Sequence, residues 1–170
     1  MTYLIRKTKS TAKSDLLGTG SFKVYKDEKE VLEIKSVWNA WEVEYGSVLY
    51  QIKGNIWGTK LNIFKKPYQI GDITFNYKLT GSITFKDKTD KEHDLLFKRK
   101  YDSWYRNGRF EVSNEDNELI LTIRSKQEKW YSSYFYEIEF KKDVTGEIDI
   151  NELIIYCFAC MRFYYAMGGA

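Results

Sequence analysis

The C-terminal segment constrains the fold of this chain more than any other part of the sequence. Between Leu153 and Met167 the only charged residue is Arg162, so a helix over this segment is apolar on every side. A helix of that kind must be enclosed by protein or by lipid. It would span only ~22 Å, against a hydrocarbon core of ~30 Å, and a bilayer would hold Arg162 near its middle. We therefore expect the rest of the chain to enclose this helix.

Residues on either side of this segment mark the ends of the helix. Asp149, followed three positions later by Glu152, has the form of a capping box, with Asp in the place that Ser or Thr usually takes. The pair Gly168-Gly169 favours a stop at the other end. The sequence therefore predicts a helix over residues 149–167.

Most of the chain before this helix alternates between apolar and polar side chains. In one run Trp41, Val43 and Tyr45 alternate with two glutamates, and similar runs recur between turn signals over residues 21–141. A period of two is typical of strands that bury one face. Aromatic residues make up 17% of the chain and there is one proline, a composition that also favours strands. We expect about a dozen short strands.

Two segments of the chain resemble each other. Residues 22–36 and 110–125 both have the pattern of a strand, an acidic turn and a second strand, and both close on Ile, a basic residue and Ser. Each is followed by a tryptophan, Trp41 or Trp130. The similarity indicates an internal duplication, and the alternative is that two hairpins with acidic turns simply look alike.

These patterns predict a mainly β fold. A closed antiparallel barrel of about a dozen strands around the C-terminal apolar helix leaves no free strand edge and encloses the helix. The alternative is a β-sandwich with a packed C-terminal helix. The length suits a single domain over residues 1–170. Within it we assign residues 1–20 to an N-terminal lead-in, residues 21–141 to strands and residues 149–167 to the central helix.

This layout resembles the tubby-like superfamily, which includes tubby C-terminal domains, phospholipid scramblases and LURP-one-related proteins. The residues that carry the resemblance are the units 22–36 and 110–125 and the terminal segment 149–167, and it covers most of the chain from about residue 20. The resemblance implies a barrel around a central helix. It also implies binding of phosphoinositides or membranes, as in some branches, while other branches have no known biochemical activity.

Charge and composition limit the classes of function. The chain has 27 basic and 24 acidic residues and a net charge of +3, a balance that predicts no nucleic-acid partner. No apolar run follows the basic residues at the start, as a secretory signal would require, and two cysteines do not make a disulfide framework. We expect a cytoplasmic protein, peripheral to a membrane if it binds lipid.

The residues that usually carry catalysis or bind metals are few. Cys157 and Cys160 form a C-x-x-C inside the apolar helix, where burial raises the thiol pKa, so core packing is the expected role. His93 is the only histidine and lies in a polar segment, which predicts a solvated turn residue. We therefore predict no catalytic residue, no metal site and no cofactor, and no recognisable enzyme class.

One enzymatic alternative remains open at this point. A carboxylate-based hydrolase needs only two acids in a cleft, and Glu42 and Glu44 lie close in sequence to Trp38 and Trp41. A cleft that holds a carboxylate pair flanked by tryptophan would support it.

The stretch over residues 98–109 is the best candidate for ligand binding. It interleaves cations with aromatic residues, a combination that attracts phosphate and suits a membrane surface. The predicted anion-binding or phosphate-binding residues are Lys98, Lys100, Arg106, Arg109 and Trp104. Asn107-Gly108 predicts a hairpin turn with two arginines at its tip. A solvated strand face is the alternative.

These residues predict a non-catalytic binding module for anionic lipid headgroups or phosphates. The expected partner is an anionic membrane surface or a phosphoinositide. A protein-interaction or structural module, with another protein as its partner, is the alternative.

Overall fold

The computed structural model of the chain describes residues 1–8, 20–37, 40–54, 59–76, 80–101, 108–127, 134–142, 144 and 148–166. Over these residues it contains twelve strands and a C-terminal helix. The strands are β1 (Thr2–Lys7), β2 (Gly20–Lys26), β3 (Lys29–Val37), β4 (Ala40–Tyr45), β5 (Val48–Gly54), β6 (Lys60–Lys65), β7 (Tyr68–Asn76), β8 (Thr80–Lys86), β9 (Glu92–Tyr101), β10 (Gly108–Ser113), β11 (Leu119–Gln127) and β12 (Tyr134–Phe140), and the helix is α2 (Ile150–Ala166).

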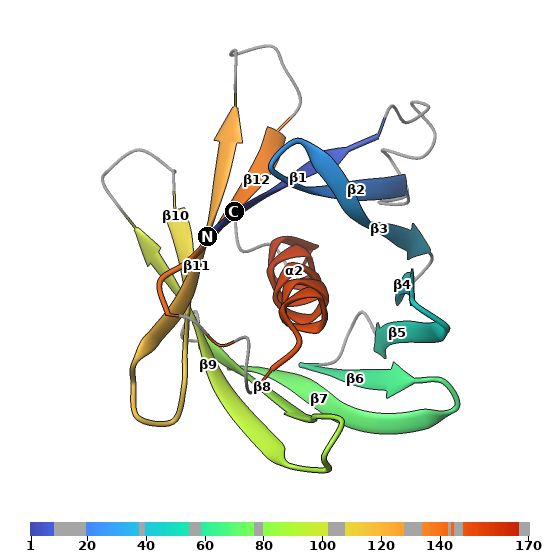
Figure 1. Cartoon of the computed structure of the whole chain (residues 1–170). Helices are drawn as coiled ribbons and strands as arrows, with labels where there is room; N and C mark the ends of the chain where they lie inside the picture. The colour runs from blue at the N-terminus through green and yellow to red at the C-terminus, as the bar shows by residue number, and fades with distance from the viewer. Residues whose placement is uncertain are drawn as a thin grey trace.

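The strands form one closed antiparallel barrel around the helix (Figure 1). Each strand pairs with its neighbours in sequence, and β1 pairs with β12 to close the ring. The predicted mainly β barrel around an apolar helix is confirmed, and the β-sandwich alternative is wrong. Alternating strands need a second apolar surface to cover their inner faces, and α2 offers one in every direction.

The core is the contact between the inner faces of the strands and the whole circumference of α2. No residue from Leu153 to Met161 is more than 1% exposed. Every strand contributes an inward side chain that is at most 1% exposed, and most of these are β-branched, as suits a pleated surface. They include Ile5, Val24, Ile34, Val43, Ile52, Ile63, Ile73, Ile83, Phe97, Val112, Ile123 and Ile138. Among the described residues, no helix is long and apolar enough to cross a membrane.

The strands begin earlier than the alternation in the sequence predicts. Residues Thr2–Lys7 form β1 between β12 and β2, so the assignment of residues 1–20 to a lead-in is wrong at this end. Tyr3 and Ile5 face inward and are buried. A run with two inward apolar positions is too short to stand out in the sequence. Tertiary pairing selects it, because without β1 the barrel would have two unpaired edges.

A β-bulge recurs at every fourth strand. The register shifts by one residue in the hairpins β2–β3, β6–β7 and β10–β11. The extra residues are Val31, Ile70 and Ile120, and the pairs that precede them are Val24–Leu32, Ile63–Gly71 and Val112–Leu121. The segments 22–36 and 110–125 therefore share their register as well as their sequence pattern. The β6–β7 hairpin is not recognised by comparing the sequences, because Gly71 occupies the position at which the other two hairpins have leucine.

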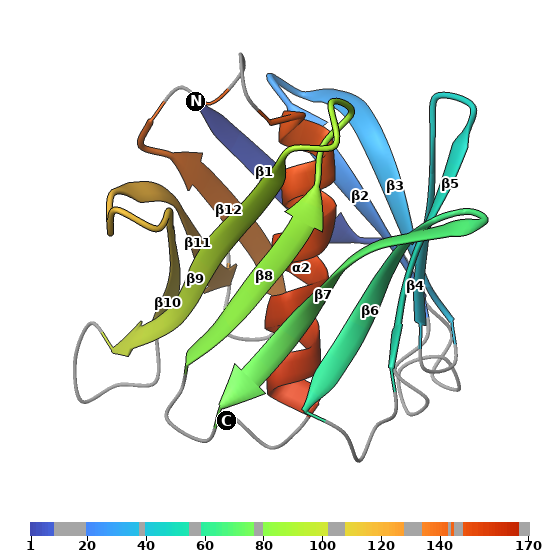
Figure 2. The same ribbon diagram turned by 90° about the horizontal axis from the view of Figure 1, so that it is seen from below.

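The up-and-down strand order gives the barrel two distinct rims (Figure 2). Helix α2 begins at the rim formed by the turns after β2, β4, β6, β8 and β10, which we call the α2-start rim. It runs through the barrel to the opposite rim, the α2-end rim, where β1, β5 and β9 end. Bulges are common at barrel rims, and the three bulges lie towards the α2-start rim.

Candidate functional site

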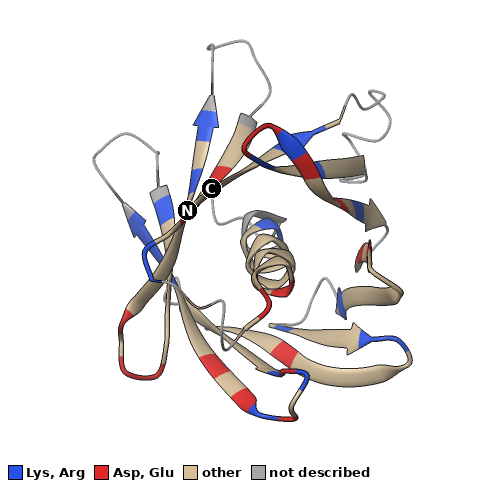
Figure 3. Ribbon diagram, in the orientation of Figure 1, with Lys and Arg blue, Asp and Glu red and all other residues tan. Residues whose placement is uncertain are grey.

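The outer face of β9, β10 and β11 carries a row of cations. Lys100 lies directly opposite Arg109 in the register of β9 and β10, and Arg109 lies directly opposite Arg124 in the register of β10 and β11. We call Lys100, Arg109 and Arg124 the basic row. Residues at opposed positions have Cβ atoms ~4.5–5.5 Å apart, and like charges there repel. Figure 3 shows Lys and Arg on these strands towards the α2-end rim.

Neighbouring carboxylates offset part of this repulsion. The Nε of Arg109 donates a hydrogen bond to Glu111 Oε1 at 2.9 Å. Arg124 lies opposite Glu137, but the Glu137 carboxylate is paired with Lys126 Nζ at 2.7 Å. The Nε of Arg124 is buried and has no hydrogen-bond partner among the described residues. The basic row therefore places three side-chain cations on neighbouring strands, whose charge an external anion could neutralise.

The structure places three of the five predicted site residues. Lys98 and Lys100 are exposed on β9, and Arg109 is partly exposed on β10. Arg106 and Trp104 lie outside the described residues. The predicted position of Arg109 at a hairpin tip is wrong, because Gly108 pairs with Tyr101 inside the ladder and Arg109 follows it as a strand residue.

Strand alternation divides the cluster that is continuous in sequence. Arg99, between the two exposed lysines, faces inward, is 6% exposed and has its Cζ 6.0 Å from the centre of the Phe110 ring. Arg99 is therefore absent from the outer row, and Arg124 contributes a cation there instead, although Arg124 is distant in sequence from the predicted site. Only the strand register identifies it, since nothing in the local sequence separates it from other outward cations.

A second polar cluster lies inside the barrel near the α2-start rim. Glu152 is 2% exposed, and its Oε1 accepts a hydrogen bond from Tyr50 OH at 2.7 Å. Lys65 Nζ, on a side chain that is 19% exposed, lies 2.9 Å from the same oxygen. Tyr156 OH donates to Glu152 Oε2 at 3.2 Å. We call these four residues the Glu152 cluster. It joins the first turns of α2 to β5 and β6.

The pKa values of the two phenols in this cluster are displaced in the same direction. Burial is the main cause for both, and the nearby Glu152 carboxylate adds to it, so the pKa of Tyr50 and of Tyr156 is raised. Both phenols therefore remain protonated at neutral pH and act as hydrogen-bond donors. All three donors of the cluster, Tyr50 OH, Lys65 Nζ and Tyr156 OH, are engaged by the Glu152 carboxylate.

The predicted capping box forms in part. Asp149 Oδ1 accepts from the backbone N–H of Asn151 at 2.9 Å and of Glu152 at 3.4 Å, which satisfies donors at the helix start. The Glu152 side chain instead points to Tyr50, Lys65 and Tyr156. Asn151 Nδ2 adds a hydrogen bond to Tyr45 OH at 2.9 Å.

The prediction that His93 is a solvated turn residue is wrong. It is an inward residue of β9, 8% exposed, and its ring stacks on Phe85 at a centroid distance of 5.3 Å. Its Nε2 lies 2.9 Å from Asp87 Oδ2. That hydrogen bond, with those from Thr89, holds the pKa of the Asp87 carboxyl well below its usual range. The strand starts before the histidine, so alternation turns the ring inward.

A hollow of about 210 Å³ lies beside His93. It is lined by Lys91, Glu92, His93, Asp94, Leu95, Asn114, Glu115, Asp116, Ile120, Lys142, Val144 and Ile148. None of these described lining residues offers a serine hydroxyl or a cysteine thiol that the histidine could activate. A catalytic triad is therefore not assembled from them.

The two cysteines are core residues, as expected. Cys157 and Cys160 are fully buried, and burial raises the pKa of both thiols. Among the described residues, no group of three or more His, Cys, Asp or Glu side chains could hold a metal ion.

The carboxylates of β4 lie on the opposite face of the sheet from its tryptophan. Glu42 accepts a hydrogen bond from Gln51 Nε2 at 2.7 Å on the outside of the barrel. The Trp41 ring packs inside against Phe163, with ring centres 6.4 Å apart. Trp38 lies outside the described residues. The wall of the barrel thus separates Glu42 and Glu44 from Trp41.

Comparison of the chain with family models, with curated proteins and with solved structures returned no match. The class of the protein is therefore defined by its fold, a closed antiparallel barrel with a helix through its centre. On its outer face this barrel carries the basic row.

Proposed function

We propose that this protein is a non-catalytic binding module for anionic groups, either phosphates or anionic lipid headgroups. The observation that carries the proposal is the basic row, in which Lys100, Arg109 and Arg124 occupy opposed positions on three neighbouring strands. Opposed like charges cost stability in the free protein. A bound anion would remove that cost by placing a negative charge among the three cations.

The magnitude of the expected binding favours a surface over a single anion. Each cation near an anionic membrane contributes ~1 kcal/mol. The basic row together with Lys98 would then contribute ~4 kcal/mol, which corresponds to a Kd of ~1 mM. Binding of this strength becomes useful when many headgroups are presented together. The resemblance to tubby-like proteins, some of which bind phosphoinositides or membranes, supports the same proposal and a peripheral membrane location.

The test is co-sedimentation with vesicles. Vesicles of phosphatidylcholine are compared with vesicles that also contain phosphatidylserine or a phosphoinositide, at low and at physiological salt. We expect the wild-type protein to prefer the anionic vesicles at low salt and to lose that preference as salt rises. Competition by inositol hexakisphosphate would show that a free phosphate compound is recognised as well as a membrane.

Matched variants locate the surface. Lys100→Gln, Arg109→Gln and Arg124→Gln together should abolish the anionic preference. Lys35→Gln, Lys53→Gln and Lys60→Gln remove the same charge from exposed positions on β3, β5 and β6 and should retain it. Absence of any preference in the wild type at low salt would exclude the anionic-ligand proposal. The protein-interaction module would then be the better explanation of the fold.

A further inference from the structure

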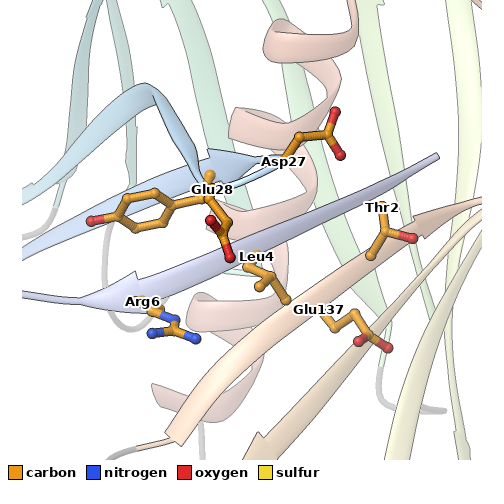
Figure 4. A pocket seen from close by; sticks show the side chains of 7 residues that line it. Thr2, Leu4, Arg6, Asp27, Glu28 and Glu137 are labelled. Atoms are coloured by element: carbon orange, nitrogen blue, oxygen red, sulfur yellow. The ribbon is translucent and has the colours of Figure 1, made fainter.

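A groove lies on the outer face of the barrel over β12, β1 and β2 (Figure 4). Its lining residue Glu137 lies directly opposite Arg124 of the basic row. Its volume is about 590 Å³, within the range of ~300–1,000 Å³ that is usual for ligand sites. It is lined by Thr2, Leu4 and Arg6 of β1, Tyr25 of β2, Asp27 and Glu28 of the β2–β3 turn, and Glu137 of β12.

Strand register explains why this part of the outer face is hollow. Leu4 lies directly opposite Tyr25 on one side and directly opposite Glu137 on the other. The short leucine side chain therefore forms a floor between two longer side chains. The turn at Asp27 and Glu28 extends over the same face of β1 (Figure 4). The result is a groove with an apolar floor, an aromatic wall and carboxylates along its margin.

The charge of the groove is opposite to that of the neighbouring basic row. Three of its lining residues are acidic and one, Arg6, is basic. Glu137 is neutralised by Lys126 at 2.7 Å. Asp27 and Glu28 are exposed, and neither forms an ion pair or a side-chain hydrogen bond with the residues that the structure describes. The groove therefore has two carboxylates that can pair with cations from outside.

The closed barrel limits how a polypeptide could bind here. β1 is hydrogen-bonded to β12 on one side and to β2 on the other, so a peptide cannot add to it as a further strand. Recognition has to come from side chains that enter the groove. A lysine or arginine side chain satisfies this requirement, because its aliphatic stem can lie on Leu4 while its charge reaches a carboxylate. The Tyr25 ring adds a face for cation–π contact.

We propose that this groove docks a basic segment of a protein partner, in which lysine or arginine alternates with apolar residues. Asp27 and Glu28 bind the cations, and Leu4 with Tyr25 contacts the aliphatic parts. This inference goes beyond the anion-binding function and does not depend on it. The two surfaces have opposite charge and separate residues, so either can fail without the other.

The β2–β3 turn supplies a variant that removes both carboxylates and should spare the fold. Asp27 and Glu28 are the two central residues of a two-residue turn, with φ of 49° and 66°. Asn-Gly is the preferred sequence for such a turn. Asp27→Asn with Glu28→Gly should therefore preserve or raise the melting temperature while it removes the acidic margin of the groove.

The experiment is fluorescence anisotropy with a labelled hexapeptide of alternating lysine and leucine, at low salt. A peptide of alternating glutamate and leucine serves as the negative probe. The wild type should bind the lysine peptide, and the Asn-Gly variant should bind it at least about fivefold more weakly, because two exposed ion pairs are lost. The matched control is Glu115→Gln with Asp116→Asn, which removes two exposed carboxylates from the β10–β11 turn at the same rim. Its affinity should stay within about twofold of the wild type.

Three results would overturn the proposal. The first is equal binding of the lysine and glutamate peptides by the wild type. The second is an equal loss of affinity in the control variant, which would indicate attraction to net charge alone. The third is a combination of two observations: spermine displaces the peptide fully, and replacing the peptide leucines by serine does not change its affinity. Together these would show that the groove binds a free organic cation. The triple glutamine variant of the basic row should bind the lysine peptide as the wild type does, whatever its behaviour with vesicles.

Discussion

Helix α2 carries an ionisable side chain near each of its ends, and the barrel accommodates the two differently. Glu152, in the first turn, is almost fully buried and contacts a lysine and two phenols. Arg162, near the other end, stays partly exposed. Its Nη1 donates to Tyr136 OH at 3.3 Å, and its Cζ lies 5.3 Å from the centre of the Phe22 ring.

The contacts that a charged side chain of α2 requires depend on how deeply it is buried in the barrel. A carboxylate removed from water needs several donors to replace its hydration, and the Glu152 cluster supplies them from three elements. A guanidinium that still reaches solvent needs less, and one phenol and one aromatic face are the contacts that the described residues provide. We therefore expect the two ends of α2 to contribute unequally to stability.

Removal of the whole helix should have the largest effect on stability. Deletion of residues 150–170 exposes the inner faces of all twelve strands, so the whole stability of the domain, ~5–15 kcal/mol, should be lost. The truncated protein should be insoluble or molten, without a cooperative thermal transition. A cooperative melt of the truncated chain would show that the barrel does not depend on its central helix.

Glu152→Ala tests the α2-start end of the helix. The substitution leaves the Lys65 charge and two buried phenols without their acceptor, which should destabilise the protein by ~3–5 kcal/mol. Urea denaturation measures the effect. Combining Glu152→Gln with Lys65→Met should restore part of the loss, because it removes both members of the ion pair. If Glu152→Ala costs no more than a surface substitution, the cluster does not hold the helix.

Arg162→Met tests the other end. Methionine keeps the length and apolar stem of the side chain while it removes a partly exposed charge, so stability should change by ~1 kcal/mol or less in either direction. The comparison with Glu152→Ala in the same urea assay is the informative quantity. Equal losses from the two substitutions would contradict the asymmetry between the ends of α2.

We expect the smallest effect on stability from the contact between Asp87 and His93 at the α2-start rim, and we expect it only at acidic pH. The pKa of Asp87 is lowered in the folded protein, so its contribution to stability is complete above the unfolded value of ~3.9 and declines as pH falls below it. Asp87→Asn should therefore reduce the loss of stability between neutral pH and pH ~3. Asp90→Asn, in the same turn, is the matched control and should leave the pH profile as in the wild type. Identical profiles for all three proteins would show that this pair does not contribute.

On the outer surface, the local sequence predicts some residues of the candidate site and misses others. Alternation along β9 correctly separates Lys98 and Lys100 from Arg99 once the strand is recognised. Arg124 could not be found in that way, because it joins the basic row through the pairing of β10 with β11. The groove has the same origin, since Leu4 becomes a floor only when Tyr25 and Glu137 stand on either side of it.

The bulges show a related limit within the fold. The similarity of segments 22–36 and 110–125 is visible in the sequence, whereas the equivalent β6–β7 hairpin is hidden by Gly71. A Cβ at Gly71 would lie 2.7 Å from Phe85 Cα and would also collide with Thr84 O of the neighbouring strand. Close approach of two backbones therefore requires glycine there. Such a requirement can be recognised only after the strands are paired.

The alternation and the apolar helix in the sequence were sufficient to predict most of the strands and the enclosed position of the helix, whereas β1 depended on pairing with β12 and β2. A period of two and a helix without a polar side are local properties, and burying both kinds of surface leads to a barrel around a helix. Which polar groups from distant segments meet depends on the tertiary structure. His93 reached Asp87 and the core, Glu152 met Lys65 and two phenols, and Arg124 joined Lys100 and Arg109. Those contacts depend on register and on the depth of α2 in the barrel, which arise from pairing between segments far apart in the chain.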